Sequence, residues 1–268
     1  MHASRLKFKK FVSRIGNKEK QFSDREGSPV VLRSRGIYLL PNLLTTGALF
    51  AGFYAIVAGM KGQFEHAAIA IFIAMIMDGL DGRVARLTNT QSAFGAQYDS
   101  LSDMVSFGVT PALVTYHWGL SNLGKFGWLV SFIYVAATAL RLARFNIQSE
   151  VTDKKYFVGL SCTAAAGVVA GMVWVGSEFD ISGRHLSPLI AVIILSLAIL
   201  MVSRLRYYSF KEIDLKSHIP FVAMLFIVLS FSIIAWNPPI VLFLVFLMYS
   251  LYGPYFWLKN RFHWGTKR

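Results

Sequence analysis

The hydrophobic positions of this chain are gathered into long runs that polar segments separate. Each run holds about 18–25 residues, enough for one helix to cross the roughly 30 Å hydrocarbon core of a bilayer. The pattern therefore predicts an all-α polytopic membrane protein with eight transmembrane helices. We place these helices at residues 37–59, 66–87, 93–118, 127–148, 157–177, 186–203, 218–236 and 238–258.

The composition agrees with a membrane protein. Of the 268 residues, 55% are hydrophobic and 15% are charged, whereas a soluble domain carries about a quarter charged residues. The single cysteine, Cys162, excludes an intramolecular disulfide framework and is expected to serve packing. No secretory signal is visible, because residues 1–36 are polar and basic.

The positive charge is sorted along the predicted topology. Of the 27 Lys and Arg residues, 24 fall on one side of the membrane, and only Lys61, Lys125 and Arg184 fall on the other. Cytoplasmic loops carry an excess of Lys and Arg, so both termini are predicted to be cytoplasmic. The same sorting argues against nucleic-acid binding as the reason for the net charge of +13, since the charges follow the loops rather than one folded face.

This topology divides the chain into three parts. Residues 1–36 form a basic cytoplasmic arm, which either lies against anionic headgroups or acts only as a topology signal. Within it, residues 3–13 have the composition of a short interfacial helix. Residues 37–258 form the eight-helix transmembrane domain, and residues 259–268 form a basic cytoplasmic tail.

Four acidic residues interrupt the second and third apolar runs. Asp78 and Asp81 are three residues apart, and Asp99 and Asp103 are four apart, so each pair shares one helical face. A carboxylate within a bilayer costs about 2.5–3.5 kcal/mol on insertion scales, so the four require compensation. A short connection makes the two helices antiparallel neighbours, and the four carboxylates can converge between them. Oxygen ligands suit Mg²⁺ or Mn²⁺, and the absence of a matching His or Cys cluster makes zinc a poor candidate.

The residues between the acids are small. Gly79, Gly82 and Ala85 would let a planar or phosphate group approach the helix backbone. The alternative is that they serve close helix packing, which small residues commonly do in membranes. Beside the acids, we favour the first interpretation.

Eight residues of the second and third runs form one spaced pattern. They are Asp78, Asp81, Gly82, Ala85, Arg86, Gly95, Asp99 and Asp103. In residue type and spacing the pattern resembles the signature of the CDP-alcohol phosphotransferase family at every defining position. The resemblance implies the fold of that family and a transfer reaction that uses a CDP-activated alcohol.

Within that family the chain resembles the integral-membrane phosphatidylserine synthases of bacteria and archaea. The segments that carry this resemblance are 41–45, 141–146 and 157–166, although Ser161 and Thr163 stand where relatives commonly have proline. The resemblance implies transfer of the phosphatidyl group of CDP-diacylglycerol to L-serine with release of CMP. It also implies a homodimer in the bacterial or archaeal cell membrane, surrounded by membrane lipids, with the active site facing the cytoplasm.

The resemblance also implies roles for the acidic residues. Asp78, Asp81 and Asp99 would be the main metal ligands, and Asp103 would lie at or near a second ion of Mg²⁺ or Mn²⁺. Asp99 and Asp103 are the expected catalytic residues, with Asp103 as the general base that deprotonates the attacking hydroxyl. The same metal pair would bridge the pyrophosphate and stabilise the departing CMP.

Further residues are expected to bind the substrates. Gly82 and Ala85 would admit the cytidine group, and Arg86 would contact the pyrophosphate. Asn42 and Thr45 are expected to bind the nucleotide. Arg141 and Arg144 are expected to bind the carboxylate of serine, and Asn146 is expected to hydrogen-bond the substrate. The alternatives are interfacial anchoring for the two arginines, helix capping for Asn146, and a helix-start and packing role for Asn42 and Thr45.

Two other functions remain open from the residues. A sister enzyme would use glycerol 3-phosphate, inositol phosphate or choline as its acceptor. A divalent-cation transporter would need polar residues along a path to both faces, whereas here the four acids gather toward one side.

Overall fold

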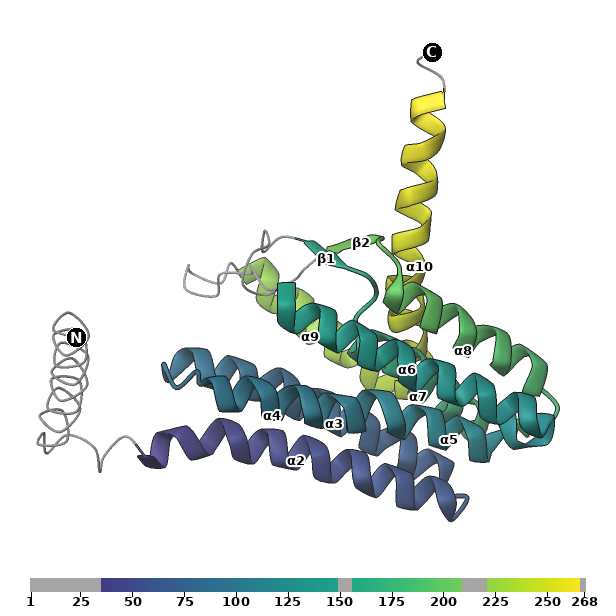
Figure 1. The fold of residues 1–268 in the computed structure, drawn as a ribbon, viewed down its shortest axis with the longest axis horizontal. Coiled ribbons are helices and arrows are strands. Elements are labelled where there is room, and N and C mark those ends of the chain that lie inside the picture. Colours follow the sequence, from purple (N-terminus) through teal and green to yellow (C-terminus); the bar gives the residue numbers. More distant parts are fainter. Residues whose placement is uncertain (1–34, 149–155, 209–220, 266–268) are drawn as a thin grey trace, which may run out of the picture.

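The computed structural model describes residues 35–148, 156–208 and 221–265, and within these ranges the chain is helical apart from one short ribbon (Figure 1). The elements are α2 (Arg35–Met60), α3 (Phe64–Leu87), α4 (Ala93–Asp103), η1 (Met104–Val109), α5 (Thr110–Trp118), η2 (Leu120–Leu123), α6 (Lys125–Gln148), β1 (Tyr156–Val158), α7 (Cys162–Glu178), α8 (Ser187–Val202), β2 (Arg206–Tyr208), α9 (Phe221–Trp236) and α10 (Pro238–Gly265). The predicted N-terminal arm and its interfacial helix fall almost wholly outside the described residues.

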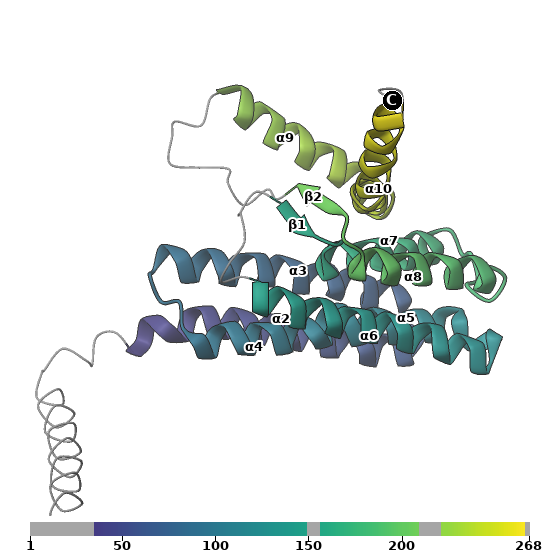
Figure 2. The same ribbon diagram turned by 45° about the horizontal axis from the view of Figure 1, so that its top comes forward.

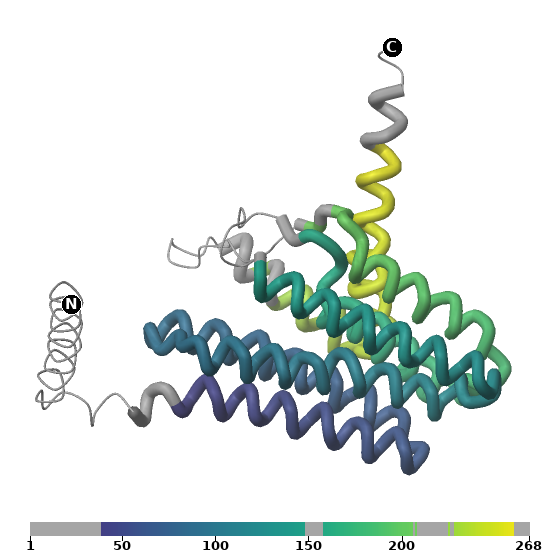
Figure 3. The backbone as a smooth tube through the Cα atoms, viewed as in Figure 1, coloured from purple at the N-terminus to yellow at the C-terminus, as the bar shows by residue number. Residues whose placement is uncertain are grey.

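The two helices that carry the acidic pattern, α3 and α4, both pack against α2. Helix α2 packs along α3 and along the continuous α4–η1–α5 helix, while α6 packs against α8, and α7 packs against α3 and α10. In Figure 2, α2 and α4 run together at the bottom of the bundle and α3 lies above them. In Figure 3, α10 rises away from the bundle toward the C-terminus.

Small side chains allow α2 and α3 to approach closely. Buried alanines line both helices, at positions 48, 51, 55 and 58 of α2 and at 67, 68, 70 and 74 of α3. Gly47 of α2 lies under Met77 of α3, where an added Cβ would stand 2.8 Å from the Met77 sulfur. In a membrane, contacts of this kind supply the van der Waals packing that the hydrophobic effect does not. The backbone spacing at the acidic end of α3 is therefore set by packing against α2.

The third predicted helix, 93–118, is helical throughout but not regular. It is an α-helix up to Asp103, a π-helix from Met104 to Val109, and an α-helix again from Thr110. Pro111 follows directly and has no N–H to donate to the carbonyl of Phe107. The hydroxyl of Tyr134 on α6 donates to that carbonyl oxygen at 3.3 Å instead. The π-helical turn thus lies next to Pro111, and the hydrogen bond from Tyr134 of α6 stabilises it.

The fifth predicted helix begins later than expected. Residues 156–158 form β1, which pairs antiparallel with β2, and α7 starts only at Cys162. Gly159 has φ +83°, a left-handed conformation that a right-handed helix cannot contain, so the helix starts only after it. Ser161 then caps α7 by accepting a hydrogen bond from the Ala164 N–H at 3.0 Å. The predicted start at residue 157 was wrong because hydropathy does not distinguish an apolar strand from a helix end.

The predicted eight membrane spans are only partly supported. Among the described residues, three helical segments are long and apolar enough to cross a bilayer: Leu39–Met60, Lys125–Ile147 and Pro238–Lys259. Helices α7 and α8 are apolar but shorter. The last helix also continues to Gly265 rather than ending near residue 258. Eight transmembrane helices, and the side on which the termini lie, stay predictions.

Candidate metal centre

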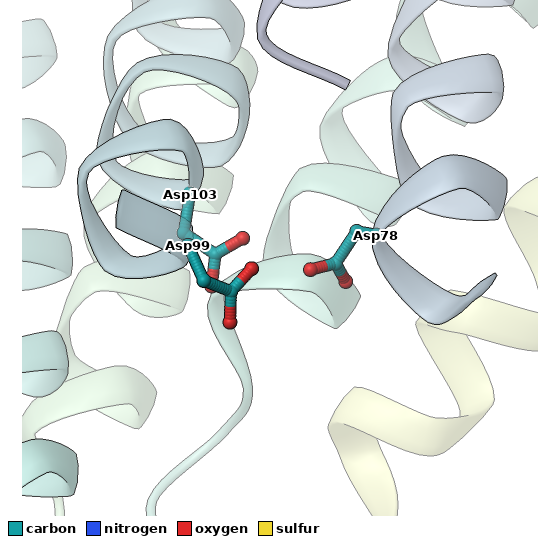
Figure 4. Close-up of side chains that lie close together, drawn as sticks. All are labelled: Asp78, Asp99 and Asp103. Carbon is teal, nitrogen blue, oxygen red and sulfur yellow. The ribbon is translucent and has the colours of Figure 1, made fainter. Parts of the chain in front are cut away.

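Three carboxylates from two helices meet in one place. Asp78 on α3 faces Asp99 and Asp103 on α4, as Figure 4 shows. One oxygen atom from each lies within 4.8 Å of the others, and all three side chains are half-buried. The i, i+4 spacing of Asp99 and Asp103 puts both on the face of α4 that looks toward α3. Three negative charges this close repel one another strongly unless a cation or proton compensates them.

The three oxygen atoms fit a hard divalent cation. Ligand oxygens lie about 2.0–2.1 Å from Mg²⁺, so two ligands on opposite sides of the ion are about 4.2 Å apart. The observed spread of up to 4.8 Å is close to this value, and a small movement of the side chains closes the difference. Carboxylates without a sulfur or imidazole ligand are the donor set of Mg²⁺ or Mn²⁺. The predicted metal-binding cluster is therefore present as a group of three acids, although the geometry does not select one ion.

The short connection between α3 and α4 brings the acids together. Asn89 adopts φ +52° in this turn, and Ser92 caps α4 by accepting the Gly95 N–H at 2.9 Å. The chain therefore reverses within residues 88–92, and α4 returns antiparallel beside α3. Asp78 lies nine residues before the end of α3, and Asp99 six residues after the start of α4, so the reversal places them at a similar depth.

Asp81 does not belong to this group of three. It is buried, at 5% exposure, and its Oδ2 atom accepts a hydrogen bond of 2.6 Å from the hydroxyl of Thr45 on α2. The expected convergence of four carboxylates is thus a cluster of three with a fourth held beside α2. The role of Asp81 as a metal ligand, and that of Thr45 in nucleotide binding, stay predictions.

Gly79 and Gly82 of α3 adjoin almost no other described side chain. An added Cβ at Gly79 would meet no atom of the described residues within 4 Å, and one at Gly82 would meet only Nη1 of Arg86, at 3.6 Å. Ala85 is half-buried, and Arg86 is exposed at the end of the same helix. Close packing between helices does not explain Gly79 and Gly82, since no described neighbour occupies that face. This favours the interpretation that the face admits a substrate.

Asn42 lies beside the start of α4. Its Oδ1 atom would stand 3.6 Å from a Cβ added at Gly95. The glycine of the pattern therefore adjoins one of the residues expected to bind the nucleotide. Nearby, the hydroxyls of Thr46 and Tyr98 are 2.9 Å apart, which ties α2 to the turn of α4 that carries Asp99. Sequence reasoning did not select Thr46 or Tyr98.

The two arginines of α6 hold backbone carbonyls. Arg141 is buried, and its Nε donates to the carbonyl of Leu160 at 2.5 Å, with Nη1 3.5 Å from the sulfur of Cys162. Nη1 of Arg144 donates to the carbonyl of Val202 at 3.0 Å. Arg141 is not an interfacial anchor, since it points into the protein. Both side chains fix the start of α7 and the end of α8, a structural task that the sequence did not predict.

Asn146 reaches the acidic helix from α6. Its side-chain amide donates to the Ser100 hydroxyl at 3.1 Å, and Ser100 in turn lies 3.2 Å from the amide oxygen. Ser100 directly follows Asp99, so this contact connects α6 to the metal-binding face of α4. The contact shows what Asn146 bonds to on another helix, and its expected roles in substrate binding or helix capping stay predictions. Nothing in the sequence marked Ser100 as a site residue except its position next to Asp99.

Comparison with known proteins identifies the family. The family model described as CDP-alcohol phosphatidyltransferase matches residues 38–203, which contain the acidic cluster and all the predicted substrate-binding residues. The chain belongs to the CDP-alcohol phosphatidyltransferase family. The match begins in α2 and ends just after α8, so it covers the helices that build the site.

Curated relatives extend over much of the chain. A CDP-diacylglycerol–serine O-phosphatidyltransferase of Helicobacter pylori (strain J99) is 38% identical over 223 residues, which is 83% of this chain and 92% of that protein. A protein of the same name from Mycobacterium tuberculosis is 41% identical over 160 residues, or 57% of this chain and 55% of its own. Another, from Methanocaldococcus jannaschii, is 35% identical over 157 residues, or 59% of this chain and 71% of its own.

Proposed function

We propose that this protein synthesises phosphatidylserine by transferring the phosphatidyl group of CDP-diacylglycerol to the hydroxyl of L-serine, with release of CMP. The observation that carries the proposal is the group of Asp78, Asp99 and Asp103 beside the open face of α3. Family membership supports the reaction class. The names of the relatives, in bacteria and an archaeon, support serine as the acceptor.

The reaction is a direct displacement at phosphorus. The serine oxygen forms a bond to the phosphatidyl phosphorus, the bond from that phosphorus to the CMP oxygen breaks, and the hydroxyl proton passes to Asp103. Asp78, Asp99 and Asp103, with Asp81 as a further ligand, would hold two ions of Mg²⁺ or Mn²⁺, which would supply stabilisation of charge on the pyrophosphate and the leaving CMP. Catalysis rests mainly on positioning and charge stabilisation.

The end of α3 binds the activated lipid. Gly82 and Ala85 leave room for the cytidine group against the helix, and Arg86, which is exposed above Gly82, contacts the pyrophosphate. Asn42, beside Gly95, adds a polar contact from α2. Thr45 acts through Asp81, whose carboxylate it orients.

The end of α6 binds serine. Arg141 and Arg144 present guanidinium groups, and a guanidinium has five N–H donors, of which only some are used on the backbone carbonyls of Leu160 and Val202. The remaining donors of these fixed forks suit the carboxylate of serine. Asn146 orients the same region through Ser100.

The enzyme works in the cell membrane of a bacterium or archaeon with its site toward the cytoplasm. Residues 37–258 form the eight-helix transmembrane catalytic domain, between a basic arm, 1–36, and a basic tail, 259–268. The distribution of Lys and Arg supports this orientation. Membrane lipids surround the domain, and two copies form a homodimer.

The decisive experiment measures CMP release from CDP-diacylglycerol by the purified protein. We expect release only when serine is present, its loss on chelation of divalent cations, and its recovery with Mg²⁺ or Mn²⁺. Asp103→Asn abolishes release without unfolding the protein. The matched control is Asp180→Asn, an exposed position between α7 and α8 that adopts φ +50°, which Asn tolerates.

Other outcomes of this experiment contradict the proposal. Release that needs glycerol 3-phosphate, inositol phosphate or choline instead of serine would assign a sister reaction to the same site. Full activity of Asp103→Asn, or turnover that survives exhaustive chelation, would contradict the proposed metal-dependent mechanism. Metal flux into proteoliposomes without CMP release would indicate a transporter.

A further inference from the structure

Three buried hydroxyls of the α4–η1–α5 helix donate hydrogen bonds across to backbone carbonyls of α2. We call them the hydroxyl row: Ser102, Ser106 and Thr110, each at most 2% exposed. Their acceptors, in the same order, are the carbonyl oxygens of Thr45, Ala48 and Gly52, at 3.2, 3.1 and 3.1 Å. The buried hydroxyl of Thr115, on the same continuous helix, donates instead to carbonyls of its own helix. The row therefore joins two helices at three successive levels.

The π-helical turn η1 keeps the row straight. Its members are four residues apart, so the first and third are separated by eight residues. At 3.6 residues per turn, a regular α-helix would rotate the third hydroxyl about 80° away from the first. The wider turn from Met104 to Val109 absorbs the extra residues, so all three hydroxyls face one neighbour. The acceptors on α2, at positions 45, 48 and 52, follow the ordinary spacing of one stripe on an α-helix.

The contact at the centre of the row is close. A Cβ added at Gly52 would stand 2.6 Å from the Ser106 oxygen and 2.9 Å from the Ser106 Cα. Only glycine lets the two backbones come this near. The Thr110 oxygen also lies 2.8 Å from the Val105 carbonyl within its own helix, whereas Ser106 bonds to α2. Ser106 is therefore the member whose hydroxyl reports most cleanly on the contact between helices.

Helix α2 is in contact with both acidic helices. It packs along α3, which carries Asp78, and the hydroxyl row fixes the rotation of α4, which carries Asp99 and Asp103. Thr45 of α2 contacts both acidic helices: Ser102 of α4 donates to its carbonyl, and its hydroxyl donates to Asp81 of α3. The rotations of α3 and α4 are thus both fixed by contacts with the same helix, α2.

We propose that the hydroxyl row positions the carboxylates of Asp99 and Asp103 opposite Asp78, so that Ser106 and Thr110 are positioning residues for a metal centre that they do not touch. This inference rests on the proposed metal centre. A helix with its side chains has a diameter of about 10–12 Å, so a rotation of roughly 10° moves a carboxylate by about 1 Å. Metal–ligand distances tolerate only about ±0.2 Å. Small losses of rotational control therefore weaken metal binding.

The test measures Mn²⁺ binding to the purified, substrate-free protein by electron paramagnetic resonance of the free ion. Ser106→Ala and Thr110→Val should each weaken Mn²⁺ binding by about tenfold, the range seen when groups that orient metal ligands are removed. Thr110→Ser, which keeps the hydroxyl, should restore the wild-type affinity. In CMP release, we expect kcat to fall while the KM for CDP-diacylglycerol stays within about twofold of wild type, since the lipid-binding face is unchanged.

The control is Thr115→Val, which removes a buried hydroxyl of the same helix that bonds only within it. It should leave Mn²⁺ affinity unchanged, whatever its effect on thermal unfolding. If Ser106→Ala and Thr110→Val bind Mn²⁺ as the wild type does and only unfold earlier, the row is merely structural and the inference is wrong. If Thr110→Val does not fold, Ser106→Ala decides alone, because it deletes a single atom. A wild type that binds no Mn²⁺ would instead refute the proposed metal centre.

Discussion

The hydroxyl of Thr45 donates a 2.6 Å hydrogen bond to Oδ2 of Asp81, between two helices that pack closely. Both residues are buried, so the carboxylate depends on protein donors, this hydroxyl and the backbone N–H of Gly82, rather than on water. The bond makes α2 part of the acidic site, although α2 contributes no acid to it.

Replacement of Thr45 should therefore weaken both the fold and the reaction. Thr45→Val keeps the shape but leaves the buried carboxylate short of a donor, which costs about 1–3 kcal/mol. We expect an earlier thermal unfolding transition and roughly tenfold slower serine-dependent CMP release, a loss of about 1.4 kcal/mol in transition-state stabilisation. Thr45→Ser, which retains the hydroxyl, should stay close to wild type. A valine variant as stable and active as wild type would show that the bond is dispensable.

Alanine at Gly82 should change stability and activity in opposite directions. A methyl group there meets only the end of the Arg86 side chain, and glycine within a helix is about 1 kcal/mol less favourable than alanine. Gly82→Ala is thus expected to unfold at a higher temperature but to bind CDP-diacylglycerol at least about tenfold less well, because the methyl group fills space needed by the nucleotide. Gly79→Ala should gain similar stability with a smaller loss of activity. An unchanged KM for CDP-diacylglycerol in Gly82→Ala would contradict the assignment.

Lysine at Arg141 separates backbone support from serine binding. Lysine cannot reproduce the guanidinium fork, which donates to the carbonyl of Leu160 and would have donors left for a substrate carboxylate. We expect Arg141→Lys to raise the KM for serine more than about tenfold, with the KM for CDP-diacylglycerol unchanged, and to lower the unfolding temperature. The control is Arg184→Lys, an exposed position before α8. If only the unfolding temperature moves, Arg141 supports the start of α7 and does not select serine.

Tyr207 should make the protein sensitive to alkaline pH. Its buried hydroxyl donates at 3.1 Å to the carbonyl of Ser250. This carbonyl has no helical partner of its own, because Pro254, four residues further along α10, lacks an N–H. Burial raises the pKa of Tyr207 in the folded protein above the value of about 10 expected for the unfolded chain. The stability it contributes is therefore complete below about pH 10 and is lost as the pH rises from there toward the folded pKa.

Tyr207→Phe tests this directly. At neutral pH it should cost about 0.5–1.5 kcal/mol, the net value of one hydrogen bond. Above about pH 10 its stability should fall less steeply than that of the wild type, as thermal unfolding at a series of pH values would show. Parallel curves for the two proteins over that range would contradict the role of Tyr207.

Much of the candidate site could be read from the sequence. The length of each apolar run located most helices to within a few residues, because a helix must satisfy its own backbone in an apolar medium. The acids were conspicuous for the same reason, since an uncompensated carboxylate in an apolar run is costly. The spacing of Asp99 and Asp103 correctly placed them on one face, and the structure brought Asp78 to them.

Other relationships were decided only by the tertiary structure. Asp81 lies with Thr45 rather than in the group of three, Arg141 donates to the carbonyl of Leu160, and Gly159 turns the chain into a strand where a helix was expected. Hydropathy and spacing determine which residues share a helical face. They do not determine the rotation and separation of neighbouring helices, and a hydrogen bond between helices forms only when both are right to within a fraction of an ångström.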